Sequence, residues 1–190
     1  MPSVPGIHAM NHPGVVLRTG SVADIDILSQ IDLEAGVLFE RAGLRLDLPK
    51  DHEFSLAERS RWLRCLSAGT VLIAVDASGG EVGFAATGVR DGEPYLDQLS
   101  VRPRSMRLGI GTELLNAATR MATERGGHAL WLTTYSHLAW NRPFYERNGF
   151  VVVSADRCDP QIAQELAYER RWLPMPQERV VMRKELVLEG

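Results

Sequence analysis

Two glycines, Gly109 and Gly111, stand directly before an apolar, helix-forming segment in the stretch SMRLGIGTELL. Glycine costs about 1 kcal/mol in a helix relative to alanine, so its use here indicates a demand on the backbone. The first turn of a helix presents amide N–H groups that lack intrahelical partners, at the positive end of the helix dipole. The glycine turn therefore predicts a binding site for an anion such as a pyrophosphate.

Two common phosphate-binding motifs do not fit this turn. A Walker loop requires Gly-Lys-Ser/Thr, but Gly111 is followed directly by Thr112. A dinucleotide fingerprint requires a third glycine, where Leu114 stands, and an acidic residue about 20 positions further on, where the sequence reads ALWLTT. A tight strand-to-helix turn without a ligand is the alternative interpretation of the two glycines.

A carboxylate interrupts the strand-like segment YLDQLSV, which precedes the glycine turn. Strand alternation predicts that Asp97 shares one face with Leu99 and Val101, while Gln98 and Ser100 face the other way. A carboxylate in the middle of a strand is poorly suited to an apolar interior unless it is paired. Asp97 is therefore a candidate general base, with a solvated or hydrogen-bonded acid as the alternative.

Alternation, helical periodicity and turn residues predict the elements that would position these groups. Ser21 and Asp24 resemble a capping box before a helix with apolar residues at helical spacing, and SLAE (55–58) resembles a second box. Asp159-Pro160 begins a further helix. Residues 1–13 are expected to form a flexible arm and residues 14–190 a single α+β domain around a mixed sheet. Its strands are expected at 15–18, 71–75, 81–89, 95–101, 128–134, 151–154 and 179–188.

Two motifs resemble those of the GNAT superfamily of N-acetyltransferases. LSVRPRSMRLGIGTELLNAA is similar to the acyl-CoA-binding motif, in which V-x-P is followed by Q/R-x-x-G-x-G/A and a long helix. NRPFYERNGF is similar to the later FY-x-x-x-GF motif. The order of predicted elements over about residues 14–188 agrees with the family. The resemblance implies an α/β/α sandwich with a mixed, mostly antiparallel twisted sheet of about seven strands flanked by helices.

The resemblance also implies acetyl-CoA as co-substrate. The family's Gln/Arg position is occupied by Met106, with Arg104 and Arg107 beside it, so the pyrophosphate is expected to bind to main-chain amides from Met106 to Thr112. Val101 is expected to pair its backbone with the pantetheine arm. The implied coenzyme-binding residues are Leu99, Val101, Met106, Arg107, Leu108, Gly109, Ile110, Gly111, Thr112, Asn141 and Phe144.

The chemistry implied by the resemblance is direct acetyl transfer to a primary amine of a small molecule in a ternary complex. A base must take a proton from the amine and an acid must protonate the departing thiolate. Tyr145 matches the family's general-acid tyrosine, with core packing beside Phe144 and Phe150 as the alternative. Asp97 lies at the offset where polyamine-acetylating members carry a carboxylate, and it is the expected base.

The acceptor site is less well indicated by the residues. Glu34 and Glu40 could hold a cationic amine or could lie on a solvated helix face. Trp131 and Trp140 could line an acceptor pocket or belong to the core. By analogy with the family, the residues expected to contact the acceptor are Thr133, Thr134 and Tyr135, at the end of the fifth strand.

Composition excludes several other classes of protein. The chain has 190 residues and a net charge of −3, so no nucleic-acid partner is expected. It has no apolar run of membrane-spanning length, and a cytoplasmic protein without a membrane partner is expected. Its two cysteines and five histidines show no metal-ligand spacing, so no metal is expected. A homodimer is common in the family. The alternatives to small-molecule acetylation are a protein or peptide N-acetyltransferase and a non-catalytic acyl-CoA sensor.

Overall fold

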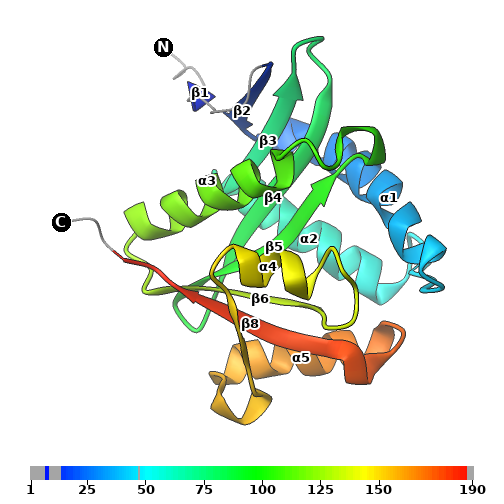
Figure 1. The fold of residues 1–190 in the computed structure, drawn as a ribbon, viewed down its shortest axis with the longest axis vertical. Helices are drawn as coiled ribbons and strands as arrows, with labels where there is room; N and C mark the ends of the chain where they lie inside the picture. Colours follow the sequence, from blue (N-terminus) through cyan, green and yellow to red (C-terminus); the bar gives the residue numbers. More distant parts are fainter. Residues whose placement is uncertain (1–6, 9–13, 47, 188–190) are drawn as a thin grey trace. The chain divides into compact units, whose positions relative to one another are not determined.

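The computed structural model describes residues 7–8, 14–46 and 48–187. These residues form a mixed sheet with the strand order β1-β2-β3-β4-β5-β6-β8-β7, flanked by helices (Figure 1). Sequence analysis predicted this fold class and about seven strands, and the eighth is the two-residue β1. The strands are β1 (Ile7–His8), β2 (Val15–Thr19), β3 (Val71–Asp76), β4 (Glu81–Arg90), β5 (Glu93–Val101), β6 (Ala129–Tyr135), β7 (Val151–Val153) and β8 (Arg179–Glu185). The α-helices are α1 (Ile25–Arg41), α2 (Glu53–Ser67), α3 (Ile110–Glu124), α4 (Arg142–Arg147) and α5 (Pro160–Trp172).

The chain forms two compact units, and β4, β5 and α3 each contribute residues to both. The first unit comprises the residues up to Gly88 together with Asp97–Met121. The second unit comprises Val89–Leu96 and the residues from Ala122 onward. Within the predicted N-terminal arm, Ile7–His8 pair antiparallel with β2, and the rest of that arm lies outside the described residues.

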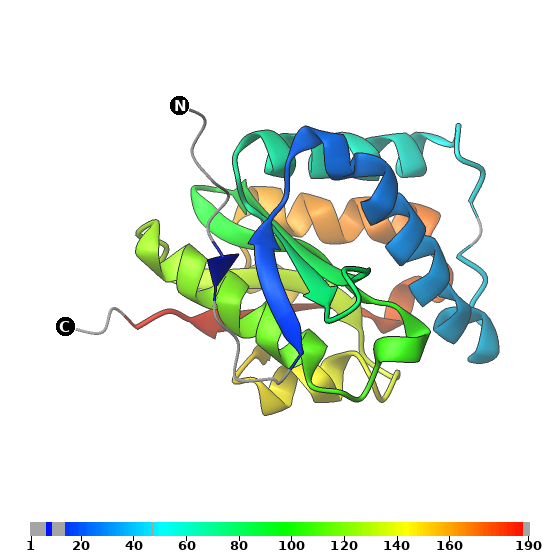
Figure 2. The same ribbon diagram turned by 90° about the horizontal axis from the view of Figure 1, so that it is seen from above.

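Helices α1 and α2 of the first unit cover one face of β3 and β4 (Figure 2). Their contact is a buried apolar cluster to which each element contributes alternate or helically spaced residues. The cluster comprises Ile25, Leu28, Ile31, Trp62, Cys65, Leu66, Val71, Ile73, Phe84 and Ala86. Gly83 faces the other way, toward Leu114 of α3. Helix α3 is thus placed on the face of the strands opposite to α1 and α2.

Side chains cap the 3₁₀ turn Val22–Asp24, which leads into α1, and the N-terminus of α2. Ser21 and Asp24 form the predicted capping box, and Arg18 donates two hydrogen bonds to the Asp24 carboxylate, at 3.0 and 2.7 Å. The arginine lowers the pKa of Asp24. The second predicted box, SLAE, was placed wrongly, because α2 begins at Glu53 with His52 as its N-cap. The imidazole Nδ1 of His52 accepts the Phe54 amide proton at 3.1 Å, a role that a Ser/Thr pattern does not reveal.

Helix α5 of the second unit packs on β6 and β8 through Ile162 and Leu166, which contact Tyr95, Trp131 and Val181. Its N-terminus is capped from the β4–β5 hairpin, 70 residues earlier in the sequence. The Asp91 carboxylate accepts the amide proton of Gln161 at 2.7 Å, and the Gln161 side chain accepts that of Asp91 at 3.2 Å. Asp91 (φ +52°) and Gly92 (φ +81°) both have positive φ, as a type I′ Asp-Gly hairpin turn requires.

Replacement of Asp91 tests this long-range cap. We expect Asp91→Gly to lower the free energy of unfolding by about 1 kcal/mol, because glycine keeps the positive φ but removes the acceptor of the Gln161 amide. Asp91→Asn is the matched control, since it tolerates the same φ and retains a side-chain oxygen. Urea denaturation of the three proteins measures the effect. Equal stability of the glycine variant and the wild type would show that the cap is not stabilising.

Candidate active site

The turn between β5 and α3 contains backbone amides that have no acceptor within the helix. A short 3₁₀ segment (Pro103–Ser105) follows β5, and Gly109, with φ +79°, adopts a conformation that favours glycine. The first i→i−4 hydrogen bond of α3 runs from the Glu113 amide to the Gly109 carbonyl, at 3.0 Å. The amides of Ile110, Gly111 and Thr112 precede this bond and are therefore available to an external acceptor.

The predicted set of free amides, Met106 to Thr112, was wrong at Met106. The Met106 amide donates to the Pro103 carbonyl at 3.3 Å, so it is already used within the turn. Arg107 has a positive φ of +61°, and both Arg107 and Leu108 are exposed. Residues 107–112 thus provide amide donors, an exposed guanidinium and a glycine without a Cβ at the approach to the helix dipole. These features fit the diphosphate of a coenzyme.

Close packing of β4 against β5 fixes the strand that leads into the turn. A Cβ added to Gly83 would lie 2.8 Å from the Ser100 carbonyl oxygen and 3.2 Å from Val101 Cγ2. Only glycine allows the two strands to approach this closely. Leu99 and Val101, which were expected to contact the coenzyme, are half-buried on β5.

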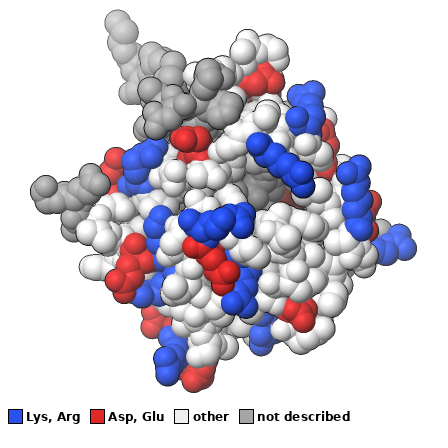
Figure 3. Space-filling view, viewed as in Figure 1, with Lys and Arg blue, Asp and Glu red and all other residues white. Residues whose placement is uncertain are grey.

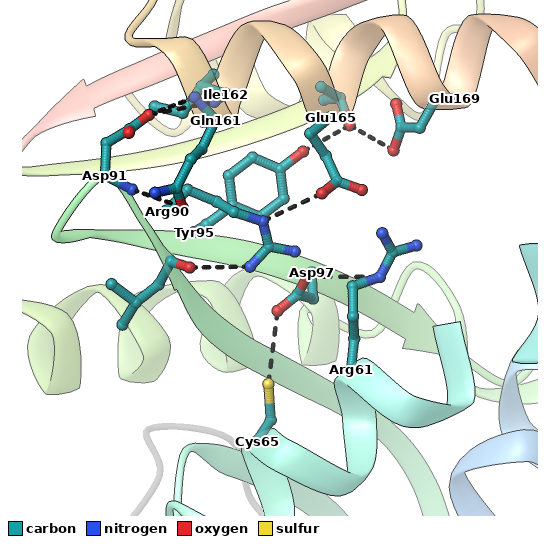
Figure 4. A network of polar contacts seen from close by, with 12 residues as sticks. Arg61, Cys65, Arg90, Asp91, Tyr95, Asp97, Gln161, Ile162, Glu165 and Glu169 are labelled. Atoms are coloured by element: carbon teal, nitrogen blue, oxygen red, sulfur yellow. Dashed lines mark hydrogen bonds and ion pairs between the residues drawn. The ribbon is translucent and has the colours of Figure 1, made fainter. Parts of the chain in front are cut away.

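Asp97 is buried and partnered within the first unit (Figure 4). Its Oδ2 lies 3.5 Å from the Cys65 thiol, and its Oδ1 lies 4.0 Å from Arg61 Nε; both partners belong to α2. The side chain of Asp97 is only 3% exposed. Burial of a carboxylate is costly unless a cation lies nearby, and Arg61 supplies a cation next to Asp97.

The predicted alternation of β5 is wrong at Asp97. Gln98 and Ser100 contact Asp32 on α1, while Asp97 contacts α2. Because α1 and α2 cover the same face, Asp97 and Gln98 both point toward the helices, which breaks the two-residue period. The strand therefore presents three polar side chains to one helical layer.

Asp32 was not identified from the sequence. Its Oδ1 accepts hydrogen bonds from Gln98 Nε2 at 2.6 Å and from Ser100 Oγ at 2.8 Å. Burial raises the pKa of the Asp32 carboxyl, and the two hydrogen bonds oppose that rise. A sequence signal was present, because Asp32 lies four residues after Leu28 on the apolar stripe of α1.

Glu34 has a partner of its own. It forms an ion pair with Arg102, whose Nε donates to the Glu81 carbonyl at 2.7 Å. Arg102 is buried and sits where β5 ends. This pairing gives Glu34 a structural contact, and its expected role in holding an amine stays a prediction. Glu40, the other acidic candidate on α1, is exposed.

Tyr145 belongs to α4 of the second unit, within an aromatic group. Its ring meets those of Phe144 and Phe150 edge-on, with centroids 5.1 and 5.6 Å away. Burial raises the pKa of Tyr145 well above its ordinary value, while the charge of Arg179 opposes the rise. The phenol therefore stays protonated throughout the neutral range. Asn141 is the N-cap residue of α4, but its side chain makes no capping hydrogen bond.

The residues expected to contact the acceptor at the end of β6 are engaged within the second unit. Thr133 Oγ1 lies 2.9 Å from the Tyr95 hydroxyl and 2.7 Å from Glu169 Oε1, and Arg179 donates to it at 3.1 Å. The Tyr135 hydroxyl donates to the Pro174 carbonyl at 2.7 Å, and burial raises the pKa of Tyr135 to about 12.

Three other aromatic or polar candidates of this unit differ in exposure. Thr134 is buried, and Trp131 packs in the apolar cluster under α5. Trp140 is partly exposed. These placements favour core packing for Trp131, the alternative that the sequence left open.

Surface charge, metal-ligating side chains and helix hydropathy were compared with the expectations from composition. Basic and acidic side chains are interspersed on the face shown in Figure 3. Within residues 7–8, 14–46 and 48–187, no group of three or more His, Cys, Asp or Glu side chains could hold a metal ion. None of the described helices is long and apolar enough to cross a membrane.

Comparison with known proteins gives a family match and a curated relative. Residues 67–152 match the acetyltransferase (GNAT) domain family. A mycothiol acetyltransferase of Segniliparus rotundus is 32% identical over 106 residues, which are 55% of this chain and 35% of that protein. The chain thus spans about a third of the length of this relative.

Solved structures share the fold at low sequence identity. The PaiA N-acetyltransferase of Thermoplasma acidophilum, solved with coenzyme A, has a TM-score of 0.64 and 18% identity over 90% of this chain and 98% of that one. The N-acetylglutamate synthase of Neisseria gonorrhoeae, solved with coenzyme A and N-acetyl-glutamate, has a TM-score of 0.65 and 17% identity over 95% of this chain and 36% of that one. A GNAT acetyltransferase of Staphylococcus aureus Mu50 has a TM-score of 0.66 and 15% identity over 91% of this chain and 99% of that one. Residues 67–152 thus carry the similarity to the acetyltransferase (GNAT) domain family that the two motifs predicted.

Proposed function

We propose that this protein is an N-acetyltransferase that moves the acetyl group of acetyl-CoA to a primary amine of a small molecule. The observation that carries the proposal is the turn at residues 107–112, where unpaired amides, Gly109 and the start of α3 meet directly after β5. This arrangement suits a diphosphate. The family match and the two coenzyme A complexes with the same fold support the choice of coenzyme.

Asp97 is the proposed base. In the reaction the amine nitrogen forms a bond with the thioester carbonyl carbon, and the carbon–sulfur bond breaks. The nitrogen must lose a proton, because a free alkylammonium, with a pKa of about 10, has no lone pair to attack with. The Asp97 side chain offers a carboxylate that can accept that proton, directly or through water, and the Arg61 guanidinium lies 4.0 Å from it.

Tyr145 is the proposed acid. The departing thiolate needs a proton, and a phenol that stays protonated can supply one without first being ionised. Burial keeps the Tyr145 pKa high, which holds the proton on the hydroxyl until the sulfur acquires charge. Among the described residues the hydroxyl has no hydrogen-bond partner, so no internal acceptor competes for this proton.

Thiol release from acetyl-CoA tests the proposed function. We expect the purified protein to release coenzyme A in the presence of small primary amines, with mass spectrometry showing the acetylated amine. Trialkylamines of similar size are the matched control, because they have no N–H to lose and give no stable amide. If thiol release were the same with and without every amine tested, the enzymatic proposal would fail.

Replacement of Tyr145 tests the proton donor. We expect Tyr145→Phe to lower kcat about 100-fold or more, since general acid catalysis typically contributes that much, while KM for acetyl-CoA changes less than about threefold. Steady-state kinetics measures both constants. The same substitution at Tyr168, on α5 of the same unit, is the control and should leave kcat unchanged. An unchanged kcat in Tyr145→Phe would remove this hydroxyl from the mechanism.

A further inference from the structure

Asp32, Gln98 and Ser100 form a polar cluster in the first unit. The side-chain donors of Gln98 and Ser100 all bind to other members of this cluster. The two Gln98 N–H groups point to Asp32 Oδ1 at 2.6 Å and Ser100 Oγ at 3.0 Å, and the Ser100 hydroxyl donates to Asp32 Oδ1 at 2.8 Å. Two polar atoms remain without a partner among the described residues, Asp32 Oδ2 and Gln98 Oε1. The amide oxygen of Gln98 only accepts hydrogen bonds, and so does Asp32 Oδ2 when the carboxylate is ionised. A ligand at this cluster must therefore bring donors.

The cluster also lacks a counter-charge. Other carboxylates of the first unit lie beside arginines: Asp24 and Glu81 beside Arg18, Asp26 beside Arg59, Glu34 beside Arg102 and Asp97 beside Arg61. Asp32 has no ion-pair partner among the described residues, although burial disfavours its charged form. A half-buried carboxylate gains most from a cation that arrives with its own hydrogen-bond donors.

An ammonium group meets both requirements. It carries a positive charge and three N–H donors, and it has no acceptor that would need a donor from the protein. A hydroxyl or amide ligand would leave the charge of Asp32 uncompensated. The partial exposure of Asp32 leaves a path from solvent to the residue.

We propose that Asp32 and Gln98 bind an ammonium group of the acceptor other than the one that is acetylated. This inference rests on the proposed function and narrows its substrate class to small molecules that carry a primary amine and a second cationic group. The reacting nitrogen is assigned elsewhere because it must lose its proton, whereas this cluster stabilises the protonated form. Asp97, the proposed base, points from β5 toward the same helical layer.

Binding of matched amines tests the inference without requiring turnover. We would titrate the protein by calorimetry with diaminoalkanes of three to five carbons and with the n-alkylamine of each length. We expect at least one diamine to bind about tenfold more tightly than its monoamine. In Asp32→Asn we expect this preference to fall to less than about twofold. The asparagine keeps an oxygen for Gln98 and Ser100 but places an N–H₂ donor at the Oδ2 position.

A second charge-removing substitution on α1 serves as the control for Asp32→Asn. Asp26 lies on α1, as Asp32 does, and forms an exposed ion pair with Arg59 of α2. Asp26→Asn removes the same charge as Asp32→Asn and should leave the preference for diamines intact. Thermal unfolding verifies that both variants are folded. Absence of any diamine preference in the wild type, or its persistence in Asp32→Asn, would overturn the inference while leaving acetyl transfer to simple amines untouched. If diamines bind as expected but no amine is acetylated, the proposed function fails and the cluster is shown to bind an ammonium group of a ligand that is not an acceptor.

Discussion

The first backbone amides of α3 have no acceptor within the helix, and the proposed coenzyme site depends on them. A helix must begin with amides that lack intrahelical acceptors, and here they follow a strand, a 3₁₀ turn and a glycine at φ +79°. The exposure of the turn leaves these donors accessible. The chain maintains this arrangement through Gly83, which lets β4 approach β5 closely, and through Arg102, which ties the end of β5 to the Glu81 carbonyl.

Strand β5 joins two kinds of polar surface within the first unit. Its last residues lead to a turn that offers donors, whereas its middle residues contribute to a cluster that offers only acceptors. A coenzyme diphosphate requires donors, and a cationic amine requires acceptors. The break in alternation at Asp97 and Gln98 places the acceptor side chains together, because a regular strand would have sent one of them to the opposite face.

The features predicted well from the sequence are those that depend on local patterns. The order of strands and helices, the Ser21–Asp24 capping box and the glycine turn all follow from spacing over a few residues. The features that were missed depend on residues far apart in the chain. Asp91 caps α5 across 70 residues, and Asp32 meets Gln98 across 66, so neither contact has a local signature. The irregularity of β5 was also missed, since each of its side chains is compatible with regular alternation.

The most direct test of the central claim is a titration of ¹⁵N-labelled protein with coenzyme A, followed by two-dimensional NMR. We expect the largest backbone amide shifts in residues 107–112, and a smaller shift of the Met106 amide, because that amide is hydrogen-bonded to the Pro103 carbonyl. Saturable shifts confined to other parts of the chain, or no shifts at millimolar coenzyme, would contradict the assignment of this turn to the diphosphate.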